Sequence, residues 1–300
     1  MDKPTQTAGP LARSNLLAYI RDFVDSLTTK TQTRSTYERA LREFVRWFDL
    51  DGRFLFAVDD VYRYRHYLMD AKKLAPASVS TYLASLRLLL NYLSRQGIIS
   101  FNPARHIRGS ARKRTDDLTY LRHDDVIRLL GSVAERDRRG LRDRAILALM
   151  VRHGMTEVEL TGANVGDFVF IDGMGALKVA GKYDAAHVLL DRMTAVLIHD
   201  YLASRVNVER QQPLFLSDGN RTRGMRMTTR GIRERINRYL RLAGVKSLDS
   251  GITPRSLRHT AAMLMADEGS SADEIKYRMR FGSLARAMKY TIRANPPAQS

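Results

Sequence analysis

Three segments in the second half of the chain hold residue types that can act on a phosphate group. The string Thr253-Pro254-Arg255-Ser256-Leu257-Arg258-His259-Thr260 carries two arginines and a histidine, Gly181-Lys182 carries a lysine, and Tyr290 follows nearer the end. Guanidinium groups bind phosphate oxygens through paired hydrogen bonds, a lysine can donate a proton, and a tyrosine oxygen can attack phosphorus. Each segment alone is weak evidence, because a lone tyrosine is more often a packing residue and a Gly-Lys turn is usually just solvated.

Other catalytic classes find little support. The chain has no cysteine, which excludes disulfides, thiolate nucleophiles and iron–sulfur clusters. It contains no H-E-x-x-H motif, no Walker loop and no nucleophile elbow, and its seven histidines do not cluster at metal-ligand spacing. We therefore expect no metal and no other cofactor.

The chain is strongly basic. Its 300 residues include 50 Lys and Arg against 32 Asp and Glu, a formal net charge of +18. Such a charge favours a polyanion, because each neutralised phosphate releases condensed counterions. We find no apolar run near the ~20 residues of a membrane helix, no signal-peptide pattern and no basic amphipathic helix of the interfacial type. We expect a cytoplasmic, nucleoid-associated protein without membrane contact. The alternative explanation of the charge is that the protein is merely soluble and basic, with no polyanion partner.

The first hundred residues are expected to form four helices. Apolar residues recur at helical spacing over 16–27 and 37–48. A third helix is expected from about Asp59 to Lys73, and a fourth from Pro76 to near Gly97, with the proline in its first turn. Together they predict an N-terminal helical DNA-binding domain over residues 1–108.

Basic residues on this domain and after it are candidates for DNA contact. Arg39, Arg42 and Arg46 recur at i, i+3 and i+7 opposite an apolar stripe, and Arg87 is a further candidate. Plain solvation of such a face is the alternative. Residues 109–117 lack apolar periodicity and include Arg112, Lys113 and Arg114, which favours a basic linker along a phosphate backbone.

Residues 118–300 are expected to form a second domain, mostly helical with one small sheet. Between Val165 and Leu190, the short β-type runs FVFI, ALKVA and HVLL are separated by Asp172-Gly173 and Gly181-Lys182. This pattern predicts three antiparallel strands, with helical periodicity before and after them. The predicted fold class is therefore mainly α with a small antiparallel β-sheet.

Four ordered segments of the chain resemble motifs of the tyrosine recombinase, or phage integrase, family. The string 253–260 resembles the T-P-H-x-L-R-H-T box, and Arg280-Phe281-Gly282-Ser283 with Tyr290 keeps the spacing of the L-G-H-x…Y segment. Residues 154–160, GMTEVEL, resemble G-L-R-x-S-E-L, and Gly181-Lys182 lies where the family carries its catalytic lysine. The resemblance extends to the helical core-binding domain and so covers nearly the whole chain, in the Xer-like arrangement of a core-binding domain followed by an α+β catalytic domain.

The resemblance implies a role for each candidate residue. Tyr290 is then the nucleophile that forms a 3′-phosphotyrosyl bond, Arg258 stabilises the charge on the phosphate, and Lys182 is the general acid. Arg255 offers further donors to the phosphate, and His259 supports the site. Because the covalent link conserves the phosphodiester energy, the reaction needs neither ATP nor metal.

The catalytic set departs from the family pattern at three positions. Arg255 stands where the family usually has His, and it still offers donors to the phosphate. Thr156 stands where the family has its first catalytic arginine, and a hydroxyl cannot replace a guanidinium fork. Phe281 stands where the family has His or Trp, which keeps bulk and loses a donor. Arg152 lies four residues before Thr156 and could compensate if the segment is helical, although a plain surface arginine is the alternative. The sequence therefore predicts a weakened or rearranged site.

Two functions follow from the resemblance. The first is a site-specific recombinase or integrase of a mobile element that acts on double-stranded DNA at a specific site. The second is a catalytically impaired relative that binds DNA as an accessory or regulatory protein. Family members assemble as tetramers on DNA, at times with a partner recombinase or accessory factor. Because Asn295-Pro296-Pro297 disfavours a helix after Tyr290, we expect a monomer in free solution.

Overall fold

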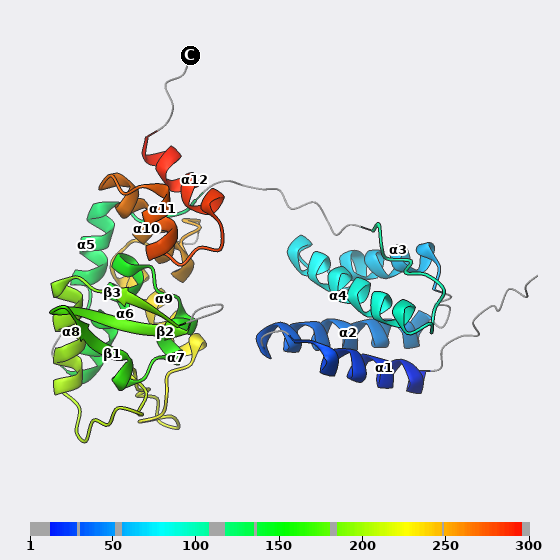
Figure 1. Ribbon diagram of the computed structural model, residues 1–300, viewed down its shortest axis with the longest axis horizontal. Helices are drawn as coiled ribbons and strands as arrows, with labels where there is room; N and C mark the ends of the chain where they lie inside the picture. The colour runs from blue at the N-terminus through cyan, green and yellow to red at the C-terminus, as the bar shows by residue number, and fades with distance from the viewer. Residues whose placement is uncertain are drawn as a thin grey trace, which may run out of the picture. The chain divides into compact units, whose positions relative to one another are not determined.

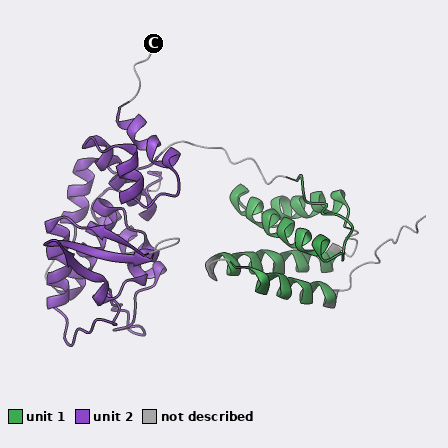
Figure 2. Ribbon diagram, in the orientation of Figure 1, with its two compact units in different colours: residues 1–115 green, residues 116–300 purple. Residues whose placement is uncertain are grey.

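The computed structural model describes residues 13–28, 31–51, 56–107, 118–134, 137–180, 185–247 and 249–295. The chain divides into two units, Met1–Thr115 and Asp116–Ser300 (Figure 2). Each unit has its own apolar core. None of the helices within the described ranges is both long and apolar enough to cross a membrane.

Unit 1 is a bundle of helices: α1 (Arg13–Ser26), α2 (Thr31–Asp51), α3 (Val58–His66) and α4 (Pro76–Arg95) (Figure 1). A π-helical turn, Tyr67–Ala71, continues α3, so the two together match the third helix expected from the sequence. The carboxylate of Asp60 accepts a hydrogen bond from the Ala57 amide at 3.0 Å and caps the start of α3.

The core of unit 1 is built from the apolar stripes of α1, α2 and α4, which contact one another, and from residues of α3 such as Tyr64. At its centre, the ring of Tyr64 lies 5.2 Å from Phe44 and 5.1 Å from Trp47, measured between ring centroids. Aromatic pairs at these distances add stability beyond the area that they bury.

Unit 2 begins with helices and inserts one sheet. Its elements are α5 (His123–Gly131), α6 (Arg138–His153), α7 (Glu157–Gly162), a 3-10 turn (Val165–Asp167), β1 (Phe168–Ile171), β2 (Met174–Ala180), β3 (Ala185–Leu189), α8 (Arg192–Ala203), α9 (Thr229–Leu242), α10 (Pro254–Asp267), α11 (Ala272–Arg278) and α12 (Leu284–Ala294). Helix α6 is buried along most of its length and contacts α8 and α10 (Figure 1).

The three strands form an antiparallel sheet in the order β1-β2-β3. Ile171 pairs with Met174, so Asp172 and Gly173 form a two-residue turn, with φ of 49° and 77°. Positive φ at both turn residues is the geometry that suits the twist of a hairpin. The fold class predicted from the sequence is confirmed.

Helices α10, α11 and α12 pack around a second, smaller apolar cluster in unit 2. This cluster contains Met279, Phe281 and Tyr290. The segment that holds the candidate nucleophile is therefore fixed by core packing.

Candidate active site

Tyr290 lies on the inner face of α12, next to α10. The residue is 2% exposed, and Ala287 one turn earlier is fully buried. Its ring stacks on Phe281 with centroids 5.8 Å apart and an interplanar angle of 9°. Its hydroxyl lies 2.6 Å from Nδ1 of His259 on α10. Ring packing and one hydrogen bond therefore hold the phenol in place.

Positive charge surrounds the His259 imidazole. Burial, and then the guanidinium groups of Arg255 and Arg258, lower the pKa of His259 to about 4. The ring is therefore neutral near pH 7, and with its proton on Nε2 it can accept a hydrogen bond from the Tyr290 hydroxyl at Nδ1. Burial raises the pKa of Tyr290, against the opposing effect of Arg258. Tyr290 is thus protonated at rest and needs a proton acceptor to become a nucleophile.

Arg258 is anchored by backbone carbonyls from two other segments. Its guanidinium donates to the carbonyl of Gly154, which follows α6, and to the carbonyl of Met279, which follows α11. The same group lies 5.3 Å from the centroid of the Phe281 ring. Burial and the nearby charge of Arg280 lower its pKa to about 10, despite the opposing effect of Glu159, so it remains charged near neutral pH.

The Thr156 hydroxyl is engaged in capping α7. Its oxygen accepts a hydrogen bond from the Glu159 amide at 3.2 Å and donates to Glu159 Oε2 at 3.0 Å. In return, Glu159 Oε2 accepts from the Thr156 amide at 2.7 Å, which completes a capping box. The residue at the position of the family's first arginine is therefore an N-cap.

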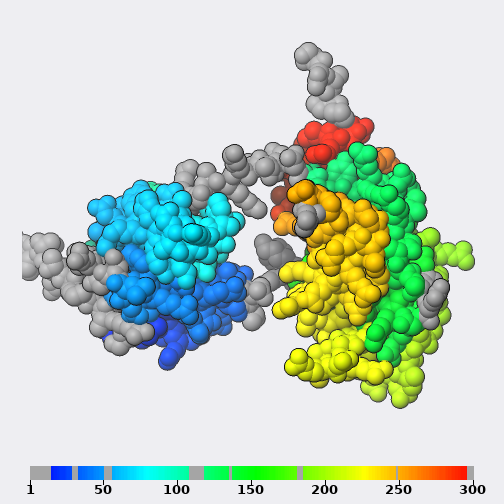
Figure 3. Space-filling model, turned by 180° about the vertical axis from the view of Figure 1, so that it is seen from behind, coloured from blue at the N-terminus to red at the C-terminus, as the bar shows by residue number. Residues whose placement is uncertain are grey.

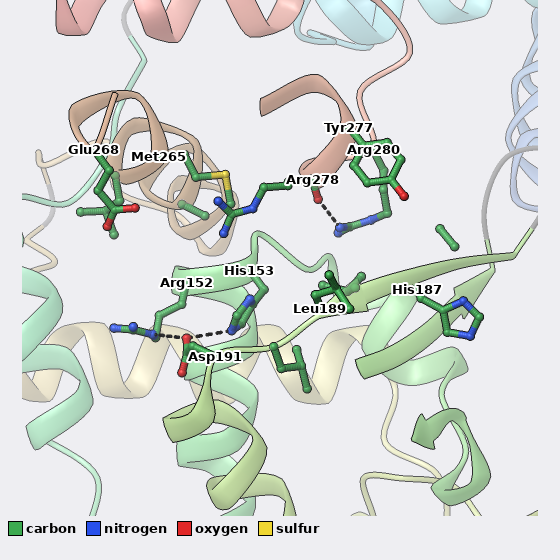
Figure 4. Close-up of a pocket in the computed structure, with 15 residues that line it drawn as sticks. Arg152, His153, His187, Leu189, Asp191, Met265, Glu268, Tyr277, Arg278 and Arg280 are labelled. Atoms are coloured by element: carbon green, nitrogen blue, oxygen red, sulfur yellow. Dashed lines mark hydrogen bonds and ion pairs between the residues drawn. The ribbon is translucent and has the colours of Figure 1, made fainter. Parts of the chain in front are cut away.

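Arg152 and Thr156 do not share a helical face. Helix α6 ends at His153, because Gly154 takes a left-handed conformation with φ of 59°. The Arg152 guanidinium instead donates to Asp191 Oδ2 at 2.7 Å, and His153 contacts the same carboxylate (Figure 4). Compensation by Arg152 requires a continuous helix from Arg152 to Thr156. That helix is not formed, because α6 ends at His153.

A different arginine reaches Glu159. Nε of Arg280 donates to Glu159 Oε1 at 2.6 Å and Nη2 donates to Oε2 at 3.1 Å. Nη2 also lies 3.4 Å from the Gly154 carbonyl oxygen that Arg258 uses. Burial alone would raise the pKa of Glu159, but the hydrogen bond and charge of Arg280, the bond from the Thr156 amide and the charge of Arg258 together keep that pKa below its ordinary value. The sequence pattern had assigned Arg280 no role.

Further positive charge lies at the entrance to Tyr290. A pocket of about 310 Å³ is lined by His259, Tyr290, Arg286 and Lys289, among others. The Arg286 guanidinium lies 5.6 Å from the Phe281 ring centroid. Arg255, in the first turn of α10, is exposed. An anion that approached the Tyr290 hydroxyl would therefore meet several cations.

Residues 119–295 match the phage integrase family, and residues 15–108 match the phage integrase SAM-like domain. The chain belongs to the phage integrase family. The resemblance stated from the sequence is confirmed. Among curated proteins, this family member is 30% identical to the tyrosine recombinase XerC of Pelobacter propionicus, over 92% of the chain and 91% of that protein. It is 26% identical to XerC of Thermodesulfovibrio yellowstonii, over 93% and 92%.

Solved structures of a recombinase and of an integrase share the fold. The XerH recombinase bound to a palindromic difH substrate matches with a TM-score of 0.75 and 18% identity, over 98% of this chain and 97% of that one. The Tn1549 transposon integrase in complex with transposon right end DNA matches with a TM-score of 0.71 and 16% identity, over 95% and 98%.

Some candidate residues of this family member lie outside the described ranges. Lys182 belongs to residues 181–184, which connect β2 and β3, and the expected linker 109–117 contains Arg112, Lys113 and Arg114. Their roles stay predictions.

The candidate DNA-binding arginines of the SAM-like domain fall into two groups. Arg39, Arg42 and Arg46 are exposed on α2 and line a pocket of about 520 Å³ with Lys72. Arg87 is half-buried, and its guanidinium donates to the carbonyls of Ala104 at 3.2 Å and of Ile107 at 2.7 Å. These two bonds hold the end of the domain, at Ala104 and Ile107, against α4.

A basic helix face in unit 2 of this integrase-family chain was not among the residues predicted from the sequence to contact DNA. Helix α9 buries Ile232, Ile236 and Leu240 and turns a row of arginines to solvent. Its surface, yellow to orange in Figure 3, forms part of one face of unit 2. The exposed arginines are Arg230, Arg233, Arg238 and Arg241. Their helical spacing was the signal that could have found this face.

Proposed function

We propose that this chain is a site-specific DNA recombinase that cuts and rejoins DNA strands through a 3′-phosphotyrosyl bond on Tyr290. The observation that carries the proposal is the Tyr290 hydroxyl, held 2.6 Å from a neutral His259 beside the Arg258 guanidinium. Family membership supports the same activity.

In the proposed reaction, the Tyr290 oxygen attacks the scissile phosphorus and its proton passes to His259 Nδ1. The bond from phosphorus to the 5′-oxygen breaks, and Lys182 donates a proton to that leaving oxygen. Arg258 and Arg255 neutralise the charge that gathers on the non-bridging oxygens. Attack by a 5′-hydroxyl reverses the steps and rejoins a strand, so the phosphodiester energy is kept in the protein–DNA link.

The proposed substrate is double-stranded DNA, bound by both units. Support comes from the exposed arginines of α2 and α9 and from the net charge of +18. Among the structural neighbours, the XerH and Tn1549 proteins are bound to DNA. Such a substrate implies action in the cytoplasm at the nucleoid.

We further propose a monomer in free solution and a tetramer on DNA, which light scattering with and without DNA would separate. The likeness to a transposon integrase supports a mobile-element origin.

The experiment uses a pool of duplexes with random sequence and one nicked strand, so that cleavage near the nick releases a short fragment and traps the adduct. Adducts that survive SDS are collected and sequenced. The wild type is expected to form adducts that converge on one sequence, and Tyr290→Phe to form none while it binds the converged duplex as tightly. Tyr277→Phe, at a residue that is 81% exposed, is the matched control.

A second candidate function is a DNA-binding relative without cleavage. The commitment of the Thr156 hydroxyl to a helix cap favours it, because that position then contributes no donor to a phosphate. Sequence-specific binding without any adduct would support this candidate and contradict the first.

A further inference from the structure

Thr156 stands where the family carries its first arginine, and the guanidinium of Arg280 lies beside it. We propose that Arg280 binds the scissile phosphate beside Arg258 and supplies the guanidinium that Thr156 lacks. This inference rests on the proposed function and names a further phosphate ligand for the same site.

The first support is the position of the Arg280 guanidinium. Glu159 Oε2 accepts from the Thr156 hydroxyl at 3.0 Å and from Arg280 Nη2 at 3.1 Å. The charge of Arg280 therefore lies next to the Thr156 side chain, although the two residues come from distant parts of the sequence. The guanidinium beside Thr156 thus belongs to the segment after α11 and not to the start of α7.

The second support is the balance of charge. Arg258 and Arg280 both lie against Glu159, with Arg258 Nη1 at 3.7 Å from Oε2, and both reach the Gly154 carbonyl oxygen. The side chains of Arg280 and Glu159 are each 14% exposed. One carboxylate thus balances only one of two adjoining, largely buried cations, and a phosphate diester would supply the missing negative charge.

The third support is the backbone of Arg280, whose φ is 54°. Side chains with a Cβ pay about 1 kcal/mol or more in the left-handed region, and such strained residues gather at functional sites. From this backbone conformation the side chain reaches Glu159, and its Nη1 donates a hydrogen bond to the carbonyl of Arg278 at 2.6 Å. Of the five N–H donors of a guanidinium, four are used by the bonds described, one of them the long contact of 3.4 Å to Gly154. The fifth N–H group, and the N–H group that makes the long contact to Gly154, can then donate to a phosphate oxygen.

Other basic residues fit the role less well. Arg152 pairs with Asp191 at 2.7 Å and not with Glu159, in the pocket of Figure 4 that Arg280 also lines. Arg286 is exposed, its guanidinium lies 5.6 Å from the Phe281 ring centroid, and no bond to Glu159 is among its described contacts.

The test measures the rate of adduct formation by full-length variants on the duplex selected with the random pool. Arg280→Ala is expected to slow adduct formation by about 10²–10³-fold, the usual effect of removing one preorganised donor from such a site. The rate of Arg280→Lys is expected to lie between those of the wild type and Arg280→Ala, since lysine keeps the charge but lacks the paired donors of a guanidinium. The double variant Thr156→Arg with Arg280→Gly returns the guanidinium to position 156 and relieves the left-handed backbone, so it is expected to recover much of the rate. Arg278→Ala, at an exposed arginine two residues away, is the matched control.

A second substrate separates a phosphate ligand from a structural ion pair. In a methylphosphonate at the scissile position, one charged oxygen is replaced by a methyl group. On it, the difference between wild type and Arg280→Ala is expected to shrink, because there is less charge to neutralise. The variant Arg280→Ala with Glu159→Gln removes both partners of the ion pair, while the glutamine oxygen can still accept from the Thr156 amide and hydroxyl, and it is expected to be as slow as Arg280→Ala.

Each outcome has a defined meaning. An Arg280→Ala protein that forms adducts at the wild-type rate, or whose deficit is equally large on the methylphosphonate, overturns the role of Arg280 and leaves the proposed function standing. A wild type that forms no adduct from any member of the pool overturns the proposed function and this inference with it.

Discussion

His259 and Tyr290 join α10 to α12 through a contact of 2.6 Å between Nδ1 and the phenolic oxygen. Burial and the charges of Arg255 and Arg258 hold the pKa of His259 at about 4, below its ordinary 6.5. We expect an NMR titration, assigned by comparison with His259→Gln, to show this imidazole neutral down to pH values near 4. A pKa near 6.5 would contradict the predicted effect of burial and of the two arginines on this imidazole.

The same shift makes stability depend on pH. Because the unfolded chain binds a proton at His259 more readily than the folded one does, the contribution is complete above pH 6.5 and is lost as the pH falls toward 4. The free energy of unfolding of the wild type should therefore decline more steeply between pH 6.5 and 4.5 than that of His259→Gln. Urea denaturation at a series of pH values measures the two slopes, and parallel slopes would contradict the prediction.

Thr156→Arg is expected to harm the protein rather than accelerate cleavage. The change removes a side-chain cap, which typically costs about 1 kcal/mol, and brings a third positive charge to Glu159 beside Arg258 and Arg280. Thr156→Ser keeps the cap and should resemble the wild type. Thermal unfolding and adduct rates measured together test this, and a faster, equally stable Thr156→Arg protein would show that the place beside Thr156 is vacant.

Arg42 and Arg87 should differ in what they do. Arg42 is exposed on α2, and Arg42→Ala is expected to lower the slope of log affinity against log salt by about 1, as one phosphate contact is lost. Arg87→Ala leaves the carbonyls of Ala104 and Ile107 without their donor, and is expected to destabilise unit 1 by about 1–3 kcal/mol with the salt slope unchanged. Binding titrations at several salt concentrations, with thermal unfolding beside them, distinguish the two effects.

The sequence predicted those features that local patterns determine. The turn at Asp172-Gly173 and the helix start at Pro76 follow from residue preferences within a few positions, and both are where the pattern placed them. Arg280 could not be foreseen in the same way, because its partner Glu159 is 121 residues away and the bond depends on a left-handed backbone. Helical spacing alone likewise does not reveal that Arg87 turns to carbonyls of a later segment.

Peptide mapping of the trapped adduct tests the central claim most directly. Trypsin cleaves after Lys289 and after Arg293, so Tyr290 is released in the peptide Tyr-Thr-Ile-Arg. After nuclease digestion, mass spectrometry should find this peptide carrying a nucleotide linked through its 3′-phosphate. A nucleotide found on any other peptide, such as the one with Tyr277, would contradict the assignment of Tyr290 as the nucleophile.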